Sequence, residues 1–197
     1  MLKRVVVATS NDGKVKEIRR ILSGIEIISI NEMKNGFFVE ERGNSYLENA
    51  YLKVFHAYKL VKEPVIAEDS GLEVLSLNNR PGVFSARYGN KKNDRERVEF
   101  LLEEMKNKED RRARFVNFTL FMWDKDEGAF FEGICKGRIA NSPMGEFGFG
   151  YDPIFIPEGY QKSFAQLGED VKNKISHRTK ALTKLKKFLS LYSSYGE

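Results

Sequence analysis

The chain has 197 residues, of which 41% are hydrophobic and 31% are charged, and its formal net charge is +5. This composition supplies a packed core and excludes a disordered chain, while so small a basic excess does not by itself indicate nucleic-acid binding. A single cysteine, Cys135, excludes an intramolecular disulfide, and no apolar run approaches the ~20 residues of a membrane span. We therefore expect a soluble, cytoplasmic protein with no membrane association.

The first part of the chain alternates predicted strands and helices. A buried strand is expected at 4–9, a helix at 13–22 and a short strand at 25–30. The next helix begins with a capping-box pattern at Ser45 and ends before Pro64.

The second part changes its hydrophobic period. A short apolar strand at 64–67 and a helix at 94–106 come first, and the alternating segments 113–123 and 129–139 then predict a long antiparallel hairpin. A helix after Ser176 ends the chain. Strand–helix units followed by a hairpin predict an α/β (mixed α+β) fold with a long central mixed sheet and helices, which we take as one domain over residues 1–197.

Residues 9–14, with the sequence TSNDGK, join the first strand to the first helix. Short polar residues and a glycine at a helix start leave backbone N–H groups unpaired, and the helix dipole favours an anion there. Lys14 can add a positive charge against a phosphate. The alternative interpretation is an ordinary Asn or Asp cap followed by a surface lysine.

Two carboxylates, Glu68 and Asp69, follow the predicted strand at 64–67, and we place them at its carboxyl end. That end of a buried strand is where α/β proteins place ligands, and only one of two successive strand residues can face a given site. Carboxylate oxygens suit Mg²⁺, and a partner carboxylate is available from Glu40 or Glu41. The alternative interpretation is a turn, because Asp-Ser-Gly is typical of turns.

Two further segments carry polar and aromatic groups. FGFGYD at 147–152 combines glycines, which allow close backbone approach, with rings on which a base can stack; a tight bend between core aromatics is the alternative. After Ser176, His177 and Arg178 lie in the first turn of a helix, where cations are unfavourable. Such a departure from a local rule favours a functional site, although a solvated basic face would also place charges there.

These segments occur in an order that resembles the inosine/xanthosine triphosphate pyrophosphatases. They are ATSNDGKVKE, VEERGNSYLENA, VIAEDSGLEV with RPGVFSARYG, FGFGYDPIF and KNKISHRTKAL, and they span most of the chain. The resemblance implies a fold with two lobes around a nucleotide cleft. It also implies hydrolysis of dITP, ITP and XTP to the monophosphate and pyrophosphate, which cleanses the nucleotide pool, with Mg²⁺ as cofactor and in a homodimer.

The resemblance assigns residue roles as well. Asp69 would be the catalytic carboxylate and a metal ligand, with Glu40 as the second metal ligand. The residues that would bind substrate are Thr9, Ser10, Asn11, Asp12, Gly13, Lys14, Ser70, Phe149, Gly150, Tyr151, Asp152, Lys172, His177 and Arg178. Donors from His177 or Arg178 would favour the 6-oxygen of hypoxanthine or xanthine over the 6-amino group of adenine.

A nucleic-acid-binding module is the alternative function. It would use the basic C-terminal helix and exposed aromatic rings, and it would leave Glu40 and Asp69 without a role.

Overall fold

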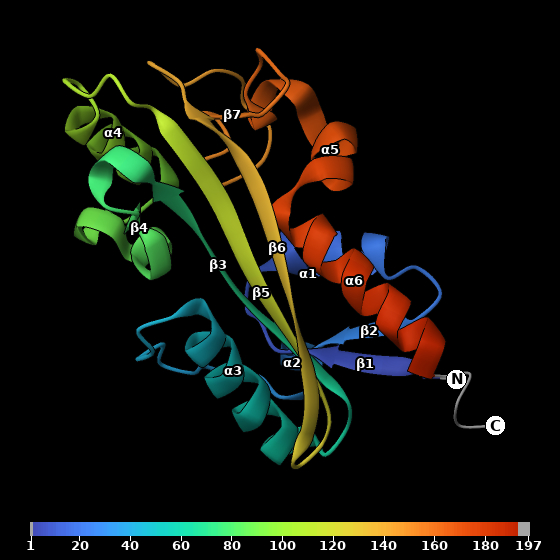
Figure 1. Cartoon of the computed structure of the whole chain (residues 1–197). Coiled ribbons are helices and arrows are strands. Elements are labelled where there is room, and N and C mark those ends of the chain that lie inside the picture. The colour runs from blue at the N-terminus through green and yellow to red at the C-terminus, as the bar shows by residue number, and fades with distance from the viewer. Residues whose placement is uncertain (1, 193–197) are drawn as a thin grey trace. The chain divides into compact units, whose positions relative to one another are not determined.

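The computed structural model describes residues 2–192 (Figure 1). They divide into two compact units. Unit 1 comprises the described residues of Met1–Asp69, Asn117–Gly133 and Arg178–Glu197, and unit 2 comprises Ser70–Val116 and Ile134–His177. The two units agree with the two lobes that the sequence predicts. The single domain over residues 1–197 and the nucleotide cleft stay predictions.

Strands and helices alternate in the first half of the chain, as expected. The strands are β1 (Arg4–Val7), β2 (Glu26–Ser29), β3 (Val65–Val74), β4 (Arg80–Pro81), β5 (Arg112–Asp124), β6 (Glu127–Ile139) and β7 (Phe155–Pro157). The α-helices are α1 (Asp12–Ile21), α2 (Ile30–Met33), α3 (Tyr46–Val61), α4 (Asp94–Glu104), α5 (Phe164–Ile175) and α6 (His177–Tyr192). Two 3₁₀ segments, η1 (Leu75–Leu77) and η2 (Gly82–Asn90), lie between β3 and α4.

The sheet is mixed. Its strands are hydrogen-bonded in the order β2-β1-β3-β5-β6-β7, and β4 pairs with β3. Strand β1 is parallel to β2 and β3, whereas β4 is antiparallel to β3 and β7 is antiparallel to β6. The expected mixed α/β fold and its long hairpin, β5–β6, are therefore confirmed.

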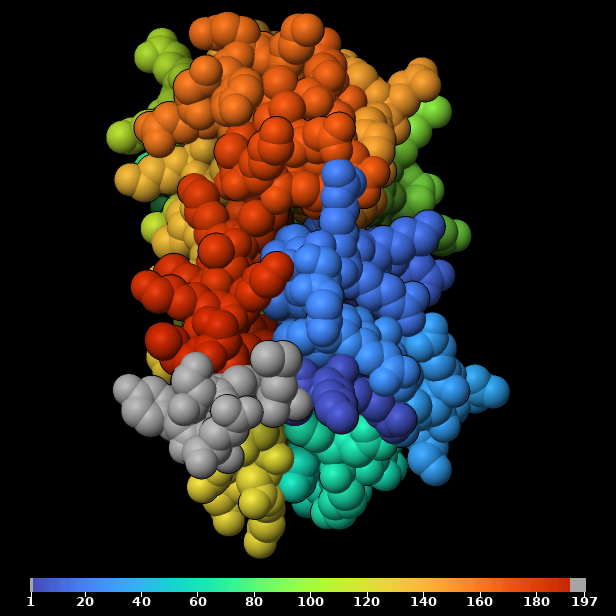
Figure 2. All heavy atoms as spheres, turned by 90° about the vertical axis from the view of Figure 1, so that its right-hand side faces the viewer, coloured from blue at the N-terminus to red at the C-terminus, as the bar shows by residue number. Residues whose placement is uncertain are grey.

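In unit 1, helices cover both faces of the sheet (Figure 1). On one face α1 and α6 pack against β1 through a cluster that includes Ile18, Leu182 and Leu185. On the other face α3 packs through Ala50 and Val54. Helices α1 and α6 also lie side by side at the surface (Figure 2), where the Lys186 ammonium donates to a carbonyl at the end of α1. This packing brings together side chains from α1, β3 and α6.

In unit 2, the core is formed by β3, β5, β6 and β7 with α4 and α5. Its largest fully buried rings are Phe155 and Phe164, whose centroids are 5.4 Å apart. Phe115 of β5 packs against Phe155 at 4.6 Å. The core therefore anchors α5, the helix that carries Lys172.

One expectation about local structure was wrong, and one helix was missed. The sequence placed Glu68 and Asp69 at the end of a short strand, but β3 continues through them to Val74. Helix α5 was not predicted, although Ser163 and Gln166 form a capping box at its start. Gly168, at φ +79°, interrupts the helical backbone and hides the period.

Within residues 2–192, no helix is both long enough and apolar enough to span a bilayer.

Candidate functional site

Residues 9–14 connect β1 to α1, as the sequence predicts. Asn11 is the N-cap of α1, and its side-chain oxygen accepts a hydrogen bond from the Lys14 backbone N–H at 3.1 Å. The hydroxyl oxygen of Thr9 accepts from the Asn11 N–H at 3.2 Å. The capping interpretation is thus correct for this backbone. The Lys14 side chain, however, is only 17% exposed, so it is not a surface lysine.

A buried cluster of charges surrounds the Lys14 ammonium in unit 1. Lys14 Nζ lies 3.2 Å from Glu68 Oε1, and the Glu68 side chain is 0% exposed. The Arg178 guanidinium donates to the same carboxylate, with Nε 2.9 Å and 2.8 Å from the two oxygens. Lys14, Glu68 and Arg178 come from α1, β3 and α6, so packing of the two helices on the sheet assembles the cluster.

Arg178 has a second carboxylate partner in Glu17 of α1. Burial would lower the pKa of Arg178, but the Glu68 and Glu17 carboxylates raise this pKa above its ordinary value, so the side chain is charged. The sequence suggested a cation without compensation at the start of α6. The structure shows that compensation comes from two carboxylates of other elements.

Burial lowers the pKa of Lys14, and the nearby charges of Lys53 and Arg178 act in the same direction. The Glu68 carboxylate raises this pKa and so opposes burial. The Glu68 carboxylate therefore favours the charged form of Lys14, and a phosphate would contact that charge.

Asp69 belongs to a second group of contacts in unit 1. Its Oδ2 accepts a hydrogen bond from Asn49 Nδ2 at 3.1 Å, and its Oδ1 lies 3.6 Å from Lys53 Nζ. Lys53 also forms an ion pair with Glu41 at 2.7 Å. Burial raises the pKa of Asp69, and the neighbouring Glu41 carboxylate raises it further. The group is a buried carboxylate with an ammonium and a second carboxylate beside it.

Sequence reasoning missed Asn49 and Lys53. Both lie on α3, four residues apart, and both are buried although they are polar. Side chains at this spacing share one helix face, and that face also carries Ala50 and Val54 of the core. The available signal for a functional role was the position of these two polar residues on an otherwise apolar helix face.

Glu40 and Glu41 lie differently. The Glu40 side chain is 61% exposed and pairs with Arg42, whereas Glu41 is 26% exposed and pairs with Lys53. Lys53 also lies near Asp69, so Glu41 and Asp69 share this lysine as a neighbour. The assignment of Glu40 as metal ligand stays a prediction, and the geometry favours the alternative, Glu41, which the sequence left open.

In unit 2, Asp152 organises the segment at 147–152. Its Oδ2 accepts the Phe149 N–H at 2.9 Å and forms an ion pair with the Lys172 ammonium at 2.7 Å. The ammonium lies 4.2 Å from the centre of the Phe149 ring. A Cβ at Gly148, where φ is +88°, would lie 2.2 Å from Asp152 Oδ2, so only glycine fits there.

The same segment borders a surface hollow of about 390 Å³, lined in part by Phe147, Phe149 and Gly150. Gly150 N–H donates to Asp94 at 2.7 Å, and the Tyr151 hydroxyl donates to the Ser85 carbonyl at 2.9 Å. The predicted alternative, a tight bend between core aromatics, thus describes Tyr151, whereas Phe149 remains partly exposed.

His177 and Ser70 are the remaining predicted residues of unit 2. His177 is buried, and its ring stacks on Phe115 with centroids 4.7 Å apart and 12° between the planes. Ser70 is half-buried in β3, immediately after Asp69. Of the predicted residues, unit 2 therefore brings Phe149, Asp152 and Lys172 into direct contact.

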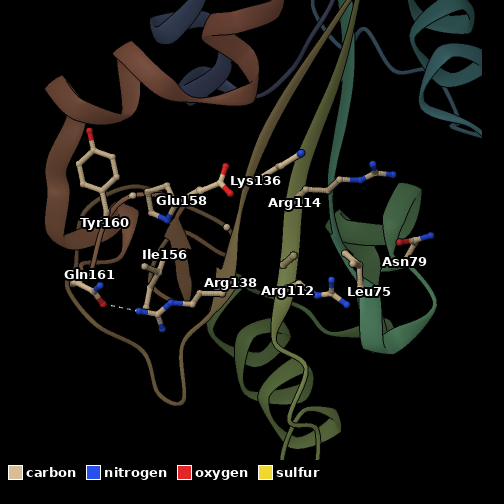
Figure 3. Close-up of a pocket in the computed structure, with 14 residues that line it drawn as sticks. Leu75, Asn79, Arg112, Arg114, Lys136, Arg138, Ile156, Glu158, Tyr160 and Gln161 are labelled. Carbon is tan, nitrogen blue, oxygen red and sulfur yellow. Dashed lines mark hydrogen bonds between the residues drawn. The ribbon is translucent and has the colours of Figure 1, made fainter.

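A separate groove of about 760 Å³ in unit 2 has no predicted site residue among its described lining (Figure 3). Its cations lie on β5 and β6 and are held at the surface. Arg114 pairs with Glu73 at 2.7 Å, and the Arg138 guanidinium donates to the side-chain oxygen of Gln161 at 2.9 Å. Charges distributed in this way are typical of the solvated face of a sheet.

Comparisons with known proteins assign the chain to a family. A model of the Ham1 family matches residues 5–188. The chain belongs to the Ham1 family. It is 45% identical to the dITP/XTP pyrophosphatase of Bacillus subtilis (strain 168) over 194 residues, covering 96% of this chain and 98% of the relative.

Solved structures agree with this assignment. The Staphylococcus aureus Ham1 protein superposes with a TM-score of 0.87 at 42% identity, covering 95% of this chain and 98% of that one. A HAM1 protein from Coxiella burnetii gives a TM-score of 0.88 at 37% identity, with the same coverage of both chains. The resemblance found in the sequence motifs is confirmed.

Proposed function

We propose that this protein hydrolyses non-standard purine nucleoside triphosphates, namely dITP, ITP and XTP, to the nucleoside monophosphate and pyrophosphate. Two findings support the proposal: the near full-length similarity to dITP/XTP pyrophosphatases, and the presence of Lys14, Asp69 and Arg178 in one unit. The observation that carries it is Asp69, a buried carboxylate with a raised pKa that is held by Asn49 and Lys53.

The residues of unit 1 serve the phosphates in this proposal. Residues 9–14 and the ammonium groups of Lys14 and Lys53 supply positive charge and N–H donors for a polyanion. In unit 2, the ring of Phe149 offers a face for the purine, and Lys172 beside it offers a cation. Donors near the purine 6-position would favour an oxygen there and reject an amino group.

The carboxylates of unit 1 fit a magnesium ion. Mg²⁺ is usually bound by one or two carboxylates together with substrate phosphates, and it keeps several waters. Asp69 and Glu41 supply that number of carboxylates, whereas no group of three or more His, Cys, Asp or Glu side chains suited to a metal occurs within residues 2–192. Bound there with the substrate, the ion would neutralise phosphate oxygens.

The chemistry assigned to this chain is activation and orientation of a water. The Asp69 carboxylate accepts a proton from the water, whose oxygen attacks the α-phosphorus in line. The bond between that phosphorus and the bridging oxygen breaks, and pyrophosphate leaves with the bonding electrons. Lys14 offsets the charge that grows on the phosphate oxygens. A raised pKa suits this role because it makes Asp69 a stronger base.

Three finer statements belong to the proposal: dependence on Mg²⁺, assembly as a homodimer and location in the cytoplasm. The alternative function, a nucleic-acid-binding module, is not supported by the matches to pyrophosphatases. Its signature would be binding to random duplex that weakens steeply with salt.

The test is hydrolysis of dITP in water enriched in heavy oxygen, followed by mass analysis of both products. We expect pyrophosphate and a monophosphate that carries the label, because the water attacks the α-phosphorus. Activity should disappear with EDTA and return with Mg²⁺. Release of inorganic phosphate and a nucleoside diphosphate, or label in the pyrophosphate, would contradict the proposal.

A further inference from the structure

Glu68 lies at the centre of the buried charges in unit 1, and the function proposed above gives it no chemical role. Its carboxylate contacts the Lys14 ammonium at 3.2 Å and receives hydrogen bonds from Arg178 Nε at 2.9 Å and 2.8 Å. It points away from Asp69, because successive residues of β3 face opposite sides of the strand. Glu68 therefore acts on the cations and not on the water.

The orientation of this carboxylate is itself fixed by β5. Asn117 Nδ2 donates to Glu68 Oε2 at 2.9 Å, and the Thr119 hydroxyl donates to Asn117 Oδ1 at 2.7 Å. Both side chains are completely buried. The Thr119 hydroxyl holds the Asn117 carbonyl, so the Asn117 amide presents its NH₂ group to Glu68. A chain of hydrogen bonds thus sets the position of Glu68 independently of Lys14 and Arg178.

Lys14 and Arg178 repel each other; Arg178 is buried, and the Lys14 side chain is only 17% exposed. Two cations can stay charged and close together only if a carboxylate lies between them. Glu17 forms an ion pair with Arg178, whereas Glu68 contacts both Arg178 and Lys14. The Glu68 carboxylate thus accepts from several cationic donors at once, as a phosphate group also does.

A salt bridge with a purely structural role is the competing explanation. Buried ion pairs contribute little net stability compared with apolar packing, so stability alone is a weak reason for this cluster. Glu73, on the same strand, is a suitable control residue. It pairs with Arg114 through the same chemistry, and neither Glu73 nor Arg114 is a candidate site residue.

We propose that Glu68 is a positioning residue, which holds the Lys14 ammonium aimed at the substrate phosphates while Asn117 and Thr119 hold Glu68 in place. The inference rests on the proposed function, because it takes Lys14 as a phosphate contact.

The experiment measures kcat and KM for dITP in Glu68→Gln, Glu68→Asp and Thr119→Val. Loss of a hydrogen bond to a charged group predicts a KM that rises about tenfold in Glu68→Gln, with a kcat that changes less. Glu68→Asp keeps the charge and should recover most of this loss. Thr119→Val, which removes no charge, should raise KM by about threefold. Glu73→Gln is the control, and its KM should match that of the unchanged protein.

A purely structural role would lower the amount of active enzyme, so kcat would fall and KM would stay the same in all variants. That result, or equal KM values in Glu68→Gln and Glu68→Asp, would overturn the inference. If Glu68→Gln does not fold, Thr119→Val decides, and an unchanged KM overturns it. Lys14→Ala separates the two proposals: if its KM is unchanged, the phosphate role of Lys14 fails, whereas a raised KM with normal Glu68 variants refutes only the role of Glu68.

Discussion

Replacement of Arg178 by methionine should strongly destabilise the protein. The Arg178 side chain is 2% exposed, and its partners Glu68 and Glu17 are 0% and 10% exposed. Methionine fills similar space but leaves both carboxylates without their guanidinium partner. Breaking a buried pair in this way costs about 3–5 kcal/mol. Because Glu68 keeps Lys14 and Asn117 as partners, we expect a loss near the lower end of that range.

The assay is urea unfolding at neutral pH, with the free energy of unfolding taken from the midpoint at constant slope. Arg95→Met is the control, since Arg95 and its partner Glu99 are 89% and 58% exposed and such a pair is worth about 0.5 kcal/mol. The double variant Arg178→Met/Glu17→Gln removes one of the two carboxylates left unpaired. It should therefore lose about 1–3 kcal/mol less than the sum of its single variants.

A loss of less than about 1 kcal/mol in Arg178→Met would refute this reasoning, because it would mean that neither carboxylate is left desolvated and unpaired. Strict additivity of the double variant would refute it as well, because Glu17 and Arg178 would then be energetically independent.

Three further predictions follow from the site. Asp69→Asn should abolish turnover of dITP and leave the melting temperature at neutral pH equal or higher. The pKa of Asp69 is raised on folding, so ionisation of Asp69 lowers the stability of the protein as pH rises from the ordinary 3.8 through the raised value. A clear drop in melting temperature would contradict this prediction. Since burial lowers the pKa of Lys14, the KM for dITP should rise with pH at values below the ordinary 10.5, and a KM that stays constant up to that pH would be inconsistent with a phosphate contact at Lys14. Gly148→Ala should lower kcat/KM at least about tenfold by displacing Asp152. The control is Gly159→Ala, which should leave kcat/KM unchanged because Gly159 also has a positive φ but no atom lies within 4 Å of the new Cβ. Equal effects of the two substitutions would assign the loss to backbone strain alone.

Local patterns predicted much of the fold. The junction of β1 and α1 was found because an apolar run, a polar cap and a helical stripe follow one another within a few residues. The β5–β6 hairpin was found because its alternation is long. The end of β3 was missed because residues 68–71 have the composition of a turn. A strand tolerates the Glu68 charge because Lys14 and Arg178, the latter 110 residues away in sequence, neutralise it.

The candidate site was predictable where residues belong to a recognisable motif. Lys53 was missed because a lysine in a helix is normally exposed, and only its long-range partners Glu41 and Asp69 account for its burial. Lys172 was found by its motif, but its helix was not, since Gly168 breaks the period. The choice between Glu40 and Glu41 depends on which side chain turns toward Lys53, and adjacent glutamates in a loop give no sequence signal for that.

The central claim is hydrolysis that selects for the purine 6-oxygen, and the most direct test compares dITP with dATP, which differ at that position. The measurement is the ratio of kcat/KM for pyrophosphate release from the two substrates with Mg²⁺ present. A site whose donors are built for an oxygen predicts a ratio of about 10² or more in favour of dITP. A ratio near one would contradict the account.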